Sequence, residues 1–422
     1  MVPCGCGCEF HRARWHFGWF DLVKAQRCLS PHDTFASLAS NWRPKVARQL
    51  SSPDRGAWHS LKAGYSVAAF VKHARNQRMN ILITGGCGFI GCNAAKYFRN
   101  RGHHVAIYDN LTRPLTELNL QWLRAGGPIE CVRGNVQDRA LVESTIRGGK
   151  FEVVLHLAGQ VAVTTSVTDP ALDFASNALG TFTVLEAVRK YSPEAVFVYA
   201  STNKVYGTLK GIQHTEGEKR YTLNGHPGGI SETQPLDFHS PYGCSKGCAD
   251  QYVIDYARIF NLRAVSLRQS CIYGTRQFGV EDQGWVAWFT IAHLLGRGVT
   301  VYGTGKQVRD VLFVDDLLRC YEMVIADIDR IKGQALNIGG GPENSLSLIE
   351  FLAMLEGMSG KPVWREFAGW RPGDQPVYIS DIGKARALLG WAPAVSAAEG
   401  VSRLYDWVKG NQACFNNDTP GK

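Results

Sequence analysis

The glycine-rich stretch that begins at Thr84 constrains the fold of this chain more than any other segment. Residues 84–91 read Thr-Gly-Gly-Cys-Gly-Phe-Ile-Gly, after the apolar residues 81–83 and before the helix-like residues 92–100. Glycines at this spacing between a strand and a helix permit a tight turn, close approach of a pyrophosphate to the backbone, and close helix–sheet packing. We therefore predict a dinucleotide-binding turn with contacts from Gly85, Gly88, Phe89, Ile90 and Gly91.

The segments that follow alternate between strand-like and helix-like patterns. Strand-like runs at 105–108, 130–133, 153–157, 195–201 and 263–267 are interspersed with helix-like segments such as 139–147. This alternation predicts an α/β fold with a Rossmann-type, doubly wound parallel sheet. We expect a dinucleotide-binding domain over residues 79–267. Residues 268–422 are expected to form mainly a smaller C-terminal substrate-binding domain, interleaved with the sheet.

The acidic residue Asp109 ends the second predicted strand and indicates which dinucleotide binds. A carboxylate there would accept hydrogen bonds from the adenosine ribose and repel a 2′-phosphate, which favours NAD over NADP. The nearby Arg113 could weaken that preference, and Asp109 could instead be a turn residue. Further cofactor contacts are expected where the second, third and fourth strands end, at Asn110, Asn135, Val136, Leu157, Ala158 and Gly159.

Charge and composition argue against several other classes of protein. Residues 1–78 hold 12 Lys and Arg against 4 Asp and Glu, whereas the remaining chain holds 34 against 33. The body therefore gives no electrostatic support for nucleic-acid binding. No apolar run approaches the roughly 18 residues of a membrane span. The cysteines show no paired metal-ligand spacing in the body, so we expect reduced thiols, no metal site and a cytoplasmic location.

Residues 1–78 do not resemble the rest of the chain. They contain Cys4, Cys6 and Cys8 and no clear helical or strand period. Three interpretations stay open: a translation start assigned upstream of a true start at Met79, an Arg-rich targeting leader, or a disordered or accessory tail. The three cysteines are too tightly spaced for a usual zinc site.

A Tyr-x-x-x-Lys pair at Tyr242 and Lys246 predicts the chemistry. Residues four apart share one face of a helix. The ordinary pKa of tyrosine is about 10, and an adjacent ammonium together with a positively charged nicotinamide should favour the phenolate. Lys246 could also bind the nicotinamide ribose, and Thr202, at the end of the fifth strand, would share the substrate hydroxyl's proton. We predict that Thr202, Tyr242 and Lys246 are catalytic.

Four segments carry a resemblance to a known family: residues 201–207, 236–247, 282–285 and 305–312. From residue 79 to about 410 the chain resembles the extended short-chain dehydrogenases/reductases of the NAD-dependent sugar epimerase/dehydratase group, and within it the CDP-paratose 2-epimerase (CDP-tyvelose 2-epimerase) family. The resemblance implies sheet order 3-2-1-4-5-6-7, tightly held NAD, a nucleotide-diphosphate hexose substrate with CDP-hexose favoured, and a homodimer or higher homo-oligomer. Asn135 departs from the superfamily, which often has aspartate there, although an amide can still bind adenine.

The pair Asn203-Lys204 limits the reaction. Sugar 4,6-dehydratases, which resemble this sequence, usually carry Asp-Glu or Glu after the strand-end hydroxyl, because elimination needs its own acid and base. Asn203 and Lys204 cannot supply them, whereas epimerisation needs only removal of a hydride and its return to the opposite face. The resemblance favours carbon 2, although the residues do not distinguish carbon 2 from carbon 4. A 4-epimerase or another nucleotide-sugar oxidoreductase, and an NAD-sensing regulator, stay as alternatives.

A diphosphate-sugar substrate needs cations. The resemblance places Arg309 and Arg371 in that role, although Arg309 could pair with Asp310 and Arg371 could brace a turn. Lys204 could contact the sugar or be a solvated strand-end lysine. The complete set of expected substrate contacts is Thr202, Asn203, Lys204, Arg276, Arg309 and Arg371.

Overall fold

The computed structural model describes residues 78–371 and 374–415. The expectations for the leader, including Cys4, Cys6 and Cys8, lie outside the described residues. Met79 directly precedes the first strand, which begins at Asn80.

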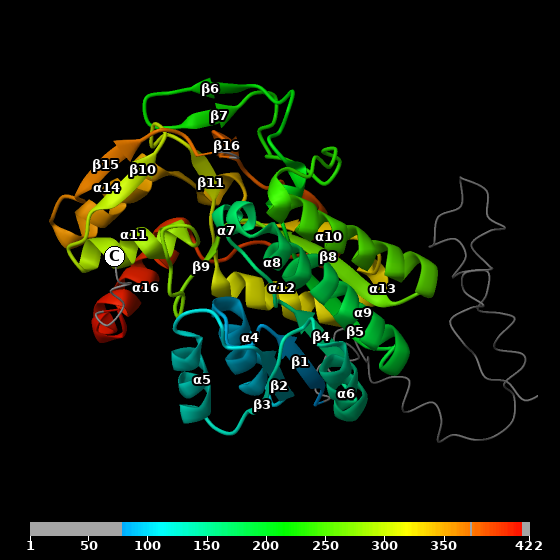
Figure 1. The fold of residues 1–422 in the computed structure, drawn as a ribbon. Helices are drawn as coiled ribbons and strands as arrows, with labels where there is room; N and C mark the ends of the chain where they lie inside the picture. Colours follow the sequence, from blue (N-terminus) through cyan, green and yellow to red (C-terminus); the bar gives the residue numbers. More distant parts are fainter. Residues whose placement is uncertain (1–77, 372–373, 416–422) are drawn as a thin grey trace, which may run out of the picture. The chain divides into compact units, whose positions relative to one another are not determined.

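A seven-stranded parallel sheet organises the fold (Figure 1). Its order is β13-β8-β5-β4-β1-β2-β3, and every neighbouring pair is parallel. The strands are β1 Asn80–Thr84, β2 His104–Asp109, β3 Glu130–Arg133, β4 Val153–His156, β5 Val196–Thr202, β8 Arg263–Gln269 and β13 Ala335–Ile338. This arrangement confirms the Rossmann-type fold and the strand order 3-2-1-4-5-6-7.

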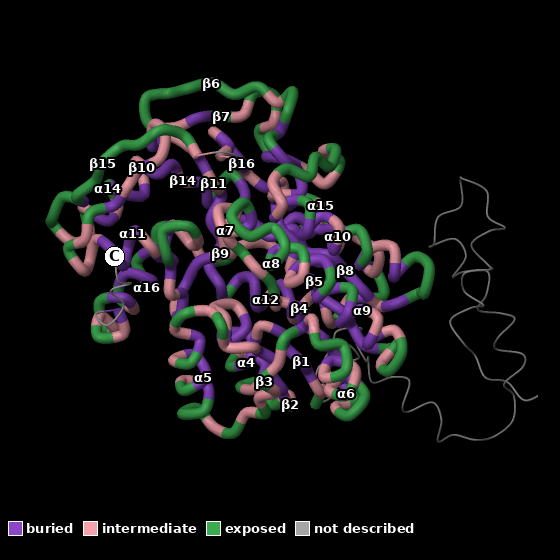
Figure 2. Tube along the Cα trace, in the orientation of Figure 1, coloured by how far each residue is buried: buried purple, intermediate pink, exposed green. Residues whose placement is uncertain are grey.

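Helices cover both faces of the sheet because side chains alternate along each strand. Ile81 and Ile83 of β1 join one buried cluster, and Leu82 joins the other. The first cluster lies against α4, α5 and α12, the second against α6, α9 and α10. Figure 2 shows the central strands buried between these layers, whereas the edge strand β3 is partly exposed. The helices are α4 Phe89–Arg99, α5 Thr116–Ala125, α6 Arg139–Gly149, α9 Gly180–Tyr191, α10 Ser240–Phe260 and α12 Val314–Ala326.

The last strand and helix of this core come from the C-terminal part of the chain. Both α12 and β13 lie beyond residue 268, and β8 ends just past the expected boundary. The described residues, 78–371 and 374–415, belong to one compact unit. The division at residue 267 therefore stays a prediction about function, since the sheet draws on both expected domains.

Small sheets and short helices complete the fold beside the main sheet (Figure 1). The strands are β6 His214–Glu216, β7 Tyr221–Leu223, β9 Ile272–Tyr273, β10 Val299–Tyr302, β11 Val308–Asp310, β12 Leu312–Phe313, β14 Ser345–Ser347, β15 Arg365–Ala368 and β16 Val377–Tyr378. The helices are α7 Val163–Thr168, α8 Pro170–Phe174, η2 Ala175–Leu179, η3 Asn203–Tyr206, α11 Trp285–Leu294, α13 Ile328–Ile331, η4 Pro342–Asn344, α14 Leu348–Ser359, α15 Gly383–Leu389, α16 Ala397–Gly410 and η5 Gln412–Cys414. Within residues 78–371 and 374–415, no helix has the length and apolar character needed to cross a membrane.

Candidate functional site

The glycine-rich turn joins β1 to α4 in a space that only glycine fits. Gly85 has φ +69°, and a Cβ there would lie 2.8 Å from the Ala158 nitrogen. A Cβ on Gly91 would lie 2.1 Å from the Gly85 carbonyl oxygen. The N-terminus of α4 opens directly after this turn, so unpaired backbone N–H groups are available to an anion. This cradle fits the pyrophosphate of a dinucleotide.

Asp109 at the end of β2 braces the same turn. Its Oδ2 accepts a hydrogen bond from the Cys87 N–H at 2.9 Å, and its Oδ1 accepts one from the Leu111 N–H at 2.8 Å. Burial raises the pKa of Asp109, and the two backbone donors oppose that increase. Each carboxylate oxygen keeps a lone pair that can accept from ribose hydroxyls. Arg113 donates to Gln283 instead of Asp109, so its contacts do not support a weaker preference for NAD.

The other expected cofactor residues lie at strand ends along the same edge of the sheet. The Asn135 carbonyl accepts from the Tyr108 hydroxyl at 2.9 Å, and the exposed Asn135 side chain accepts from the Gln137 N–H at 3.1 Å. The Ala158 N–H donates to Thr84 Oγ1 at 3.3 Å, which holds the end of β4 against the glycine-rich turn. The remaining members of this group occupy the predicted strand ends: Asn110, Val136, Leu157 and Gly159.

The three predicted catalytic side chains come from two packed elements. Thr202 ends β5, while Tyr242 and Lys246 lie one turn apart on α10, and all three are buried. Thr202 Oγ1 accepts from the Lys204 N–H at 3.3 Å, which turns the chain into η3. Lys246 Nζ donates to the Ala200 carbonyl at 2.6 Å. Contact between β5 and α10 thus joins residues that are distant in sequence.

Burial shifts the pKa of both members of this pair. Burial raises the pKa of Tyr242 to about 12; Thr202 opposes the increase and Asp173 adds to it. Burial lowers the pKa of Lys246 to about 7, although Asp250 and Asp173 favour its charged form. Burial disfavours the phenolate, and the Lys246 ammonium is directed to the Ala200 carbonyl. The expectation that Lys246 and a nicotinamide charge together favour the phenolate stays a prediction.

A cluster of cations lies near the strand-end residues. Burial lowers the pKa of Lys204 to about 8; Arg309 and Arg371 lower it further, and Asp374 opposes them. Burial also lowers the pKa of Arg309. Arg371 pairs with Asp374 at 3.1 Å, in keeping with the alternative that it braces a turn. Cations that disfavour one another's charge are well suited to bind an anion.

The alternative of an Arg309–Asp310 ion pair is not found among the described residues. Asp310 instead accepts from the Ser270 hydroxyl at 2.6 Å, and Ser270 Oγ accepts in turn from Asn203 Nδ2 at 3.5 Å. This chain of contacts holds the Asn203 amide beside Thr202. The two positions after Thr202 thus present an amide at Asn203 and an amine at Lys204, where an acid pair would be needed for elimination.

Arg276 is engaged in packing. It is buried, and it donates to Asn119 Oδ1 at 2.9 Å and to the Leu118 carbonyl at 2.8 Å. Its guanidinium also lies 5.0 Å from the Trp122 ring centroid. These contacts tie Arg276 to α5, and its role as a substrate ligand stays a prediction without further support.

Sequence reasoning missed two polar residues next to the catalytic pair. Asp173 on α8 is 1% exposed, and its carboxylate accepts from the Ser245 hydroxyl and from Asn177 Nδ2. His156 at the end of β4 contacts two threonine hydroxyls, and burial lowers its pKa to about 3. The only sequence signal for the contacts of Asp173 was its spacing of four residues from Asn177, which places the two side chains on one helix face.

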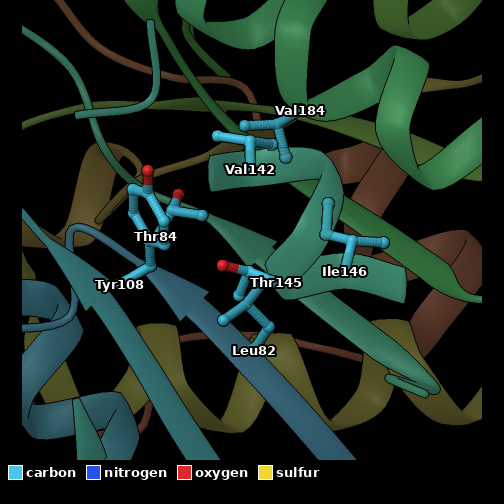
Figure 3. A pocket seen from close by; sticks show the side chains of 7 residues that line it. All are labelled: Leu82, Thr84, Tyr108, Val142, Thr145, Ile146 and Val184. Carbon is cyan, nitrogen blue, oxygen red and sulfur yellow. The ribbon is translucent and has the colours of Figure 1, made fainter. Parts of the chain in front are cut away.

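A small cavity elsewhere in the fold is a packing gap. Figure 3 shows its seven lining residues, which come from β1, β2, α6 and α9. It has no room for a water molecule. Its lining is mostly apolar, with hydroxyls from Thr84, Tyr108 and Thr145. A ligand would need more space, so we do not assign a site there.

Comparison with known proteins agrees with this geometry. Residues 81–339 match the NAD dependent epimerase/dehydratase family. The chain is 45% identical over 335 residues to CDP-paratose 2-epimerase of Salmonella typhi, covering 78% of this chain and 99% of that protein. UDP-glucose 4-epimerase of Thermus thermophilus, solved with NAD, is 30% identical with TM-score 0.66, covering 79% of this chain and all of that one. The dTDP-glucose 4,6-dehydratase of Streptomyces venezuelae, also solved with NAD, has 27% identity and TM-score 0.69 over 79% of this chain and 98% of that one.

These findings confirm the resemblance inferred from the sequence and the prediction of NAD as cofactor. The family match covers the glycine-rich turn, Asp109, Thr202, Tyr242 and Lys246. The chain belongs to the NAD-dependent epimerase/dehydratase family.

Proposed function

We propose that this protein is an NAD-dependent epimerase that inverts carbon 2 of a nucleotide-diphosphate hexose, with a CDP-hexose of the CDP-paratose type favoured. The observation that carries the proposal is the strand end at Thr202. The Thr202 hydroxyl and the Tyr242 phenol lie together there. Thr202 is followed in the sequence by Asn203 and Lys204 instead of an acid pair. The relative named CDP-paratose 2-epimerase supports the choice of carbon and base.

The cofactor would be held by the glycine-rich turn, the N-terminus of α4 and Asp109. When bound, NAD accepts a hydride from a carbinol carbon, adds a positive charge to the site in its oxidised form, and returns the hydride. Lys246 would donate to a ribose hydroxyl with the N–H groups that the Ala200 carbonyl does not use.

Tyr242 is the group that moves the proton. Its phenol is protonated near neutral pH because burial raises its pKa to about 12. Positive charge in the site lowers that pKa and allows the phenolate to take the proton of the substrate hydroxyl. The Thr202 hydroxyl orients the same substrate oxygen. Once the sugar presents its other face, Tyr242 gives the proton back, so both the enzyme and the overall redox state are unchanged.

The cations Lys204, Arg309 and Arg371 would bind the diphosphate and the adjoining sugar. Burial weakens the hydration of Lys204 and Arg309, so the negative charge of a diphosphate would be well compensated there. Asp374 keeps Arg371 oriented through their ion pair.

Product analysis with CDP-, GDP- and UDP-hexoses tests this function. A substrate deuterated at carbon 2 should give the inverted sugar with the label retained, because the same hydride returns. Loss of the label to solvent, or no inversion at carbon 2, would contradict the proposal. Inversion at carbon 4 would support the alternative of a 4-epimerase, which the UDP-glucose 4-epimerase relatives favour.

The assembly that we propose is a homodimer. One face of α8, η2, α9 and α10 exposes a row of apolar side chains, and the rings of Phe182 and Tyr252 lie 5.8 Å apart across it. The members of this face are Leu172, Phe174, Leu179, Phe182, Tyr252, Ile259 and Phe260. A second copy of the chain would cover this surface. Phe182→Asp should give a monomer by light scattering, whereas Trp364→Asp, at an exposed ring in the loop before β15, should not. A cytoplasmic location agrees with the free thiols of the eight described cysteines.

A further inference from the structure

A buried carboxylate lies behind the catalytic helix without a cation of its own. Asp173 is 1% exposed, and within residues 78–371 and 374–415 it takes part in no ion pair. Its Oδ1 accepts from Asn177 Nδ2 at 3.0 Å, and its Oδ2 accepts from the Ser245 hydroxyl. A buried charge is costly unless an opposite charge lies near. A compensating cation is therefore expected in the neighbourhood.

The compensating cation is Lys246. Ser245 directly precedes Lys246 on α10. Asp173 raises the pKa of Lys246, and Lys246 lowers the pKa of Asp173. Asp250, the other carboxylate that affects Lys246, is held by Arg268 at 2.8 Å and by the Ser266 hydroxyl. Asp250 still favours the charged form of Lys246 despite this pairing, and Asp173 adds to its effect as a buried carboxylate that has no ion pair among the described residues.

We infer that Asp173 is a positioning residue for the proposed catalytic pair: through Ser245 it anchors the Tyr242–Lys246 face of α10, and together with Asp250 it favours the charged form of Lys246. This inference rests on the proposed roles of Tyr242 and Lys246 and goes beyond them. Without Asp173, a smaller fraction of Lys246 should be protonated at a given pH, which would weaken a charge-assisted hydrogen bond to a ribose oxygen.

Apart from Asp250, the groups packed around this part of α10 add no negative charge that favours protonated Lys246. His156 on β4 stays neutral because burial lowers its pKa to about 3. Tyr199 on β5 lies 4.3 Å below the Lys246 ammonium, and burial raises its pKa well above its ordinary value, so it is neutral too. Lys204 on η3 is a cation, and Glu186 on α9 is held by Arg189 at 2.6 Å. The segments α7 and η2 contain no titratable side chain.

Removing the Asp173 charge should change the pKa values of two neighbouring side chains in the same direction. Asp173 raises the pKa of both Tyr242 and Lys246. The variant Asp173→Asn keeps the size and one acceptor oxygen of the side chain but loses the charge, so the pKa values of Tyr242 and Lys246 should both fall. The shift should be on the order of one pH unit, the scale for unit charges several Å apart at an effective dielectric constant of about 20.

The test measures the titration of Lys246 directly in the full-length protein. Its acetylation rate by acetic anhydride, followed by mass spectrometry across pH, should show a midpoint about one unit lower in D173N than in the unaltered protein. Asp255→Asn removes an exposed carboxylate from the same helix and should leave the midpoint unchanged. Asp173→Glu keeps the charge and should restore it. If D173N does not fold, Asp173→Ser, which leaves room for water, makes the same comparison.

The pH profile of epimerisation is the second measurement. Both limbs of the profile should move to lower pH in D173N, whereas a loss of structure alone would lower the maximum without moving the limbs. An unchanged Lys246 midpoint in D173N or D173S, or an equal shift in D255N, would overturn the inference. The lysine titration does not depend on the sugar, so absence of epimerase activity in the unaltered protein would refute the proposed function separately.

Discussion

Substitution of Gly91 by alanine should damage both stability and cofactor binding. The new Cβ would lie 2.1 Å from the Gly85 carbonyl oxygen, 2.7 Å from the Gly86 Cα and 2.9 Å from the Gly85 carbonyl carbon. All three are backbone atoms, so no side chain can rotate away. An ordinary contact needs about 3.5 Å, which means that α4 and the turn must separate by more than about 1 Å.

The cost follows from that separation. Overpacking in a close-packed interior costs roughly 1–3 kcal/mol when neighbouring side chains yield. Here the backbone itself must move, so we expect a loss of at least about 3 kcal/mol in the free energy of unfolding. The same movement displaces the N-terminus of α4 from the pyrophosphate cradle. NAD affinity should therefore fall by more than about tenfold.

Denaturant unfolding and calorimetric titration with NAD measure the two effects. Gly148→Ala is the matched control, because a Cβ at this position in α6 meets nothing within 4 Å. The control should be neutral or stabilise the helix by up to about 1 kcal/mol. Unaltered unfolding and NAD binding in G91A would refute the packing argument for the glycine-rich turn.

Three further predictions concern single side chains. Tyr242→Phe should abolish turnover and spare NAD binding, as product analysis and calorimetry would show; undiminished turnover would remove the proposed base. Lys204→Met should raise KM for the nucleotide sugar roughly tenfold, the scale of one charge-assisted hydrogen bond, with little change in kcat; an unchanged KM would identify a merely solvated lysine. His156 has its folded-state pKa lowered to about 3, so the unfolded chain binds a proton first as pH falls below about 6.5. The free energy of unfolding should therefore decline as pH falls from about 6.5 towards 3, and the decline should be smaller in His156→Gln. An equally steep decline in the variant and the unaltered protein would contradict this.

The local sequence was sufficient for the fold class and the cofactor. The apolar runs and the glycine spacing specify parallel strands and the turn at Gly85, because backbone conformation there depends on residue type alone. Motif spacing likewise predicted that Tyr242 and Lys246 share a helix face. The order of the strands came from family resemblance, because periodicity does not specify which strands pair.

Contacts between segments that are distant in the sequence could not be predicted from local sequence patterns. Asp173 lies 72 residues from Ser245, and Asn203 lies 67 residues from Ser270. The spacing rules for helices and strands describe only neighbours along one element, so neither contact could be anticipated. The assignment of Arg276 rested on its neighbourhood in the chain, whereas the fold commits it to α5.

The sequence alone predicted which groups carry out redox chemistry at a carbinol: Thr202, Tyr242 and Lys246, with no acid pair beside them. Only the tertiary structure gave the environment of those groups. Burial between β5 and α10 raises the pKa of Tyr242 and lowers that of Lys246. The physical reason is that a pKa depends on desolvation and on every nearby charge, including Asp173, and these are set by packing across the whole chain.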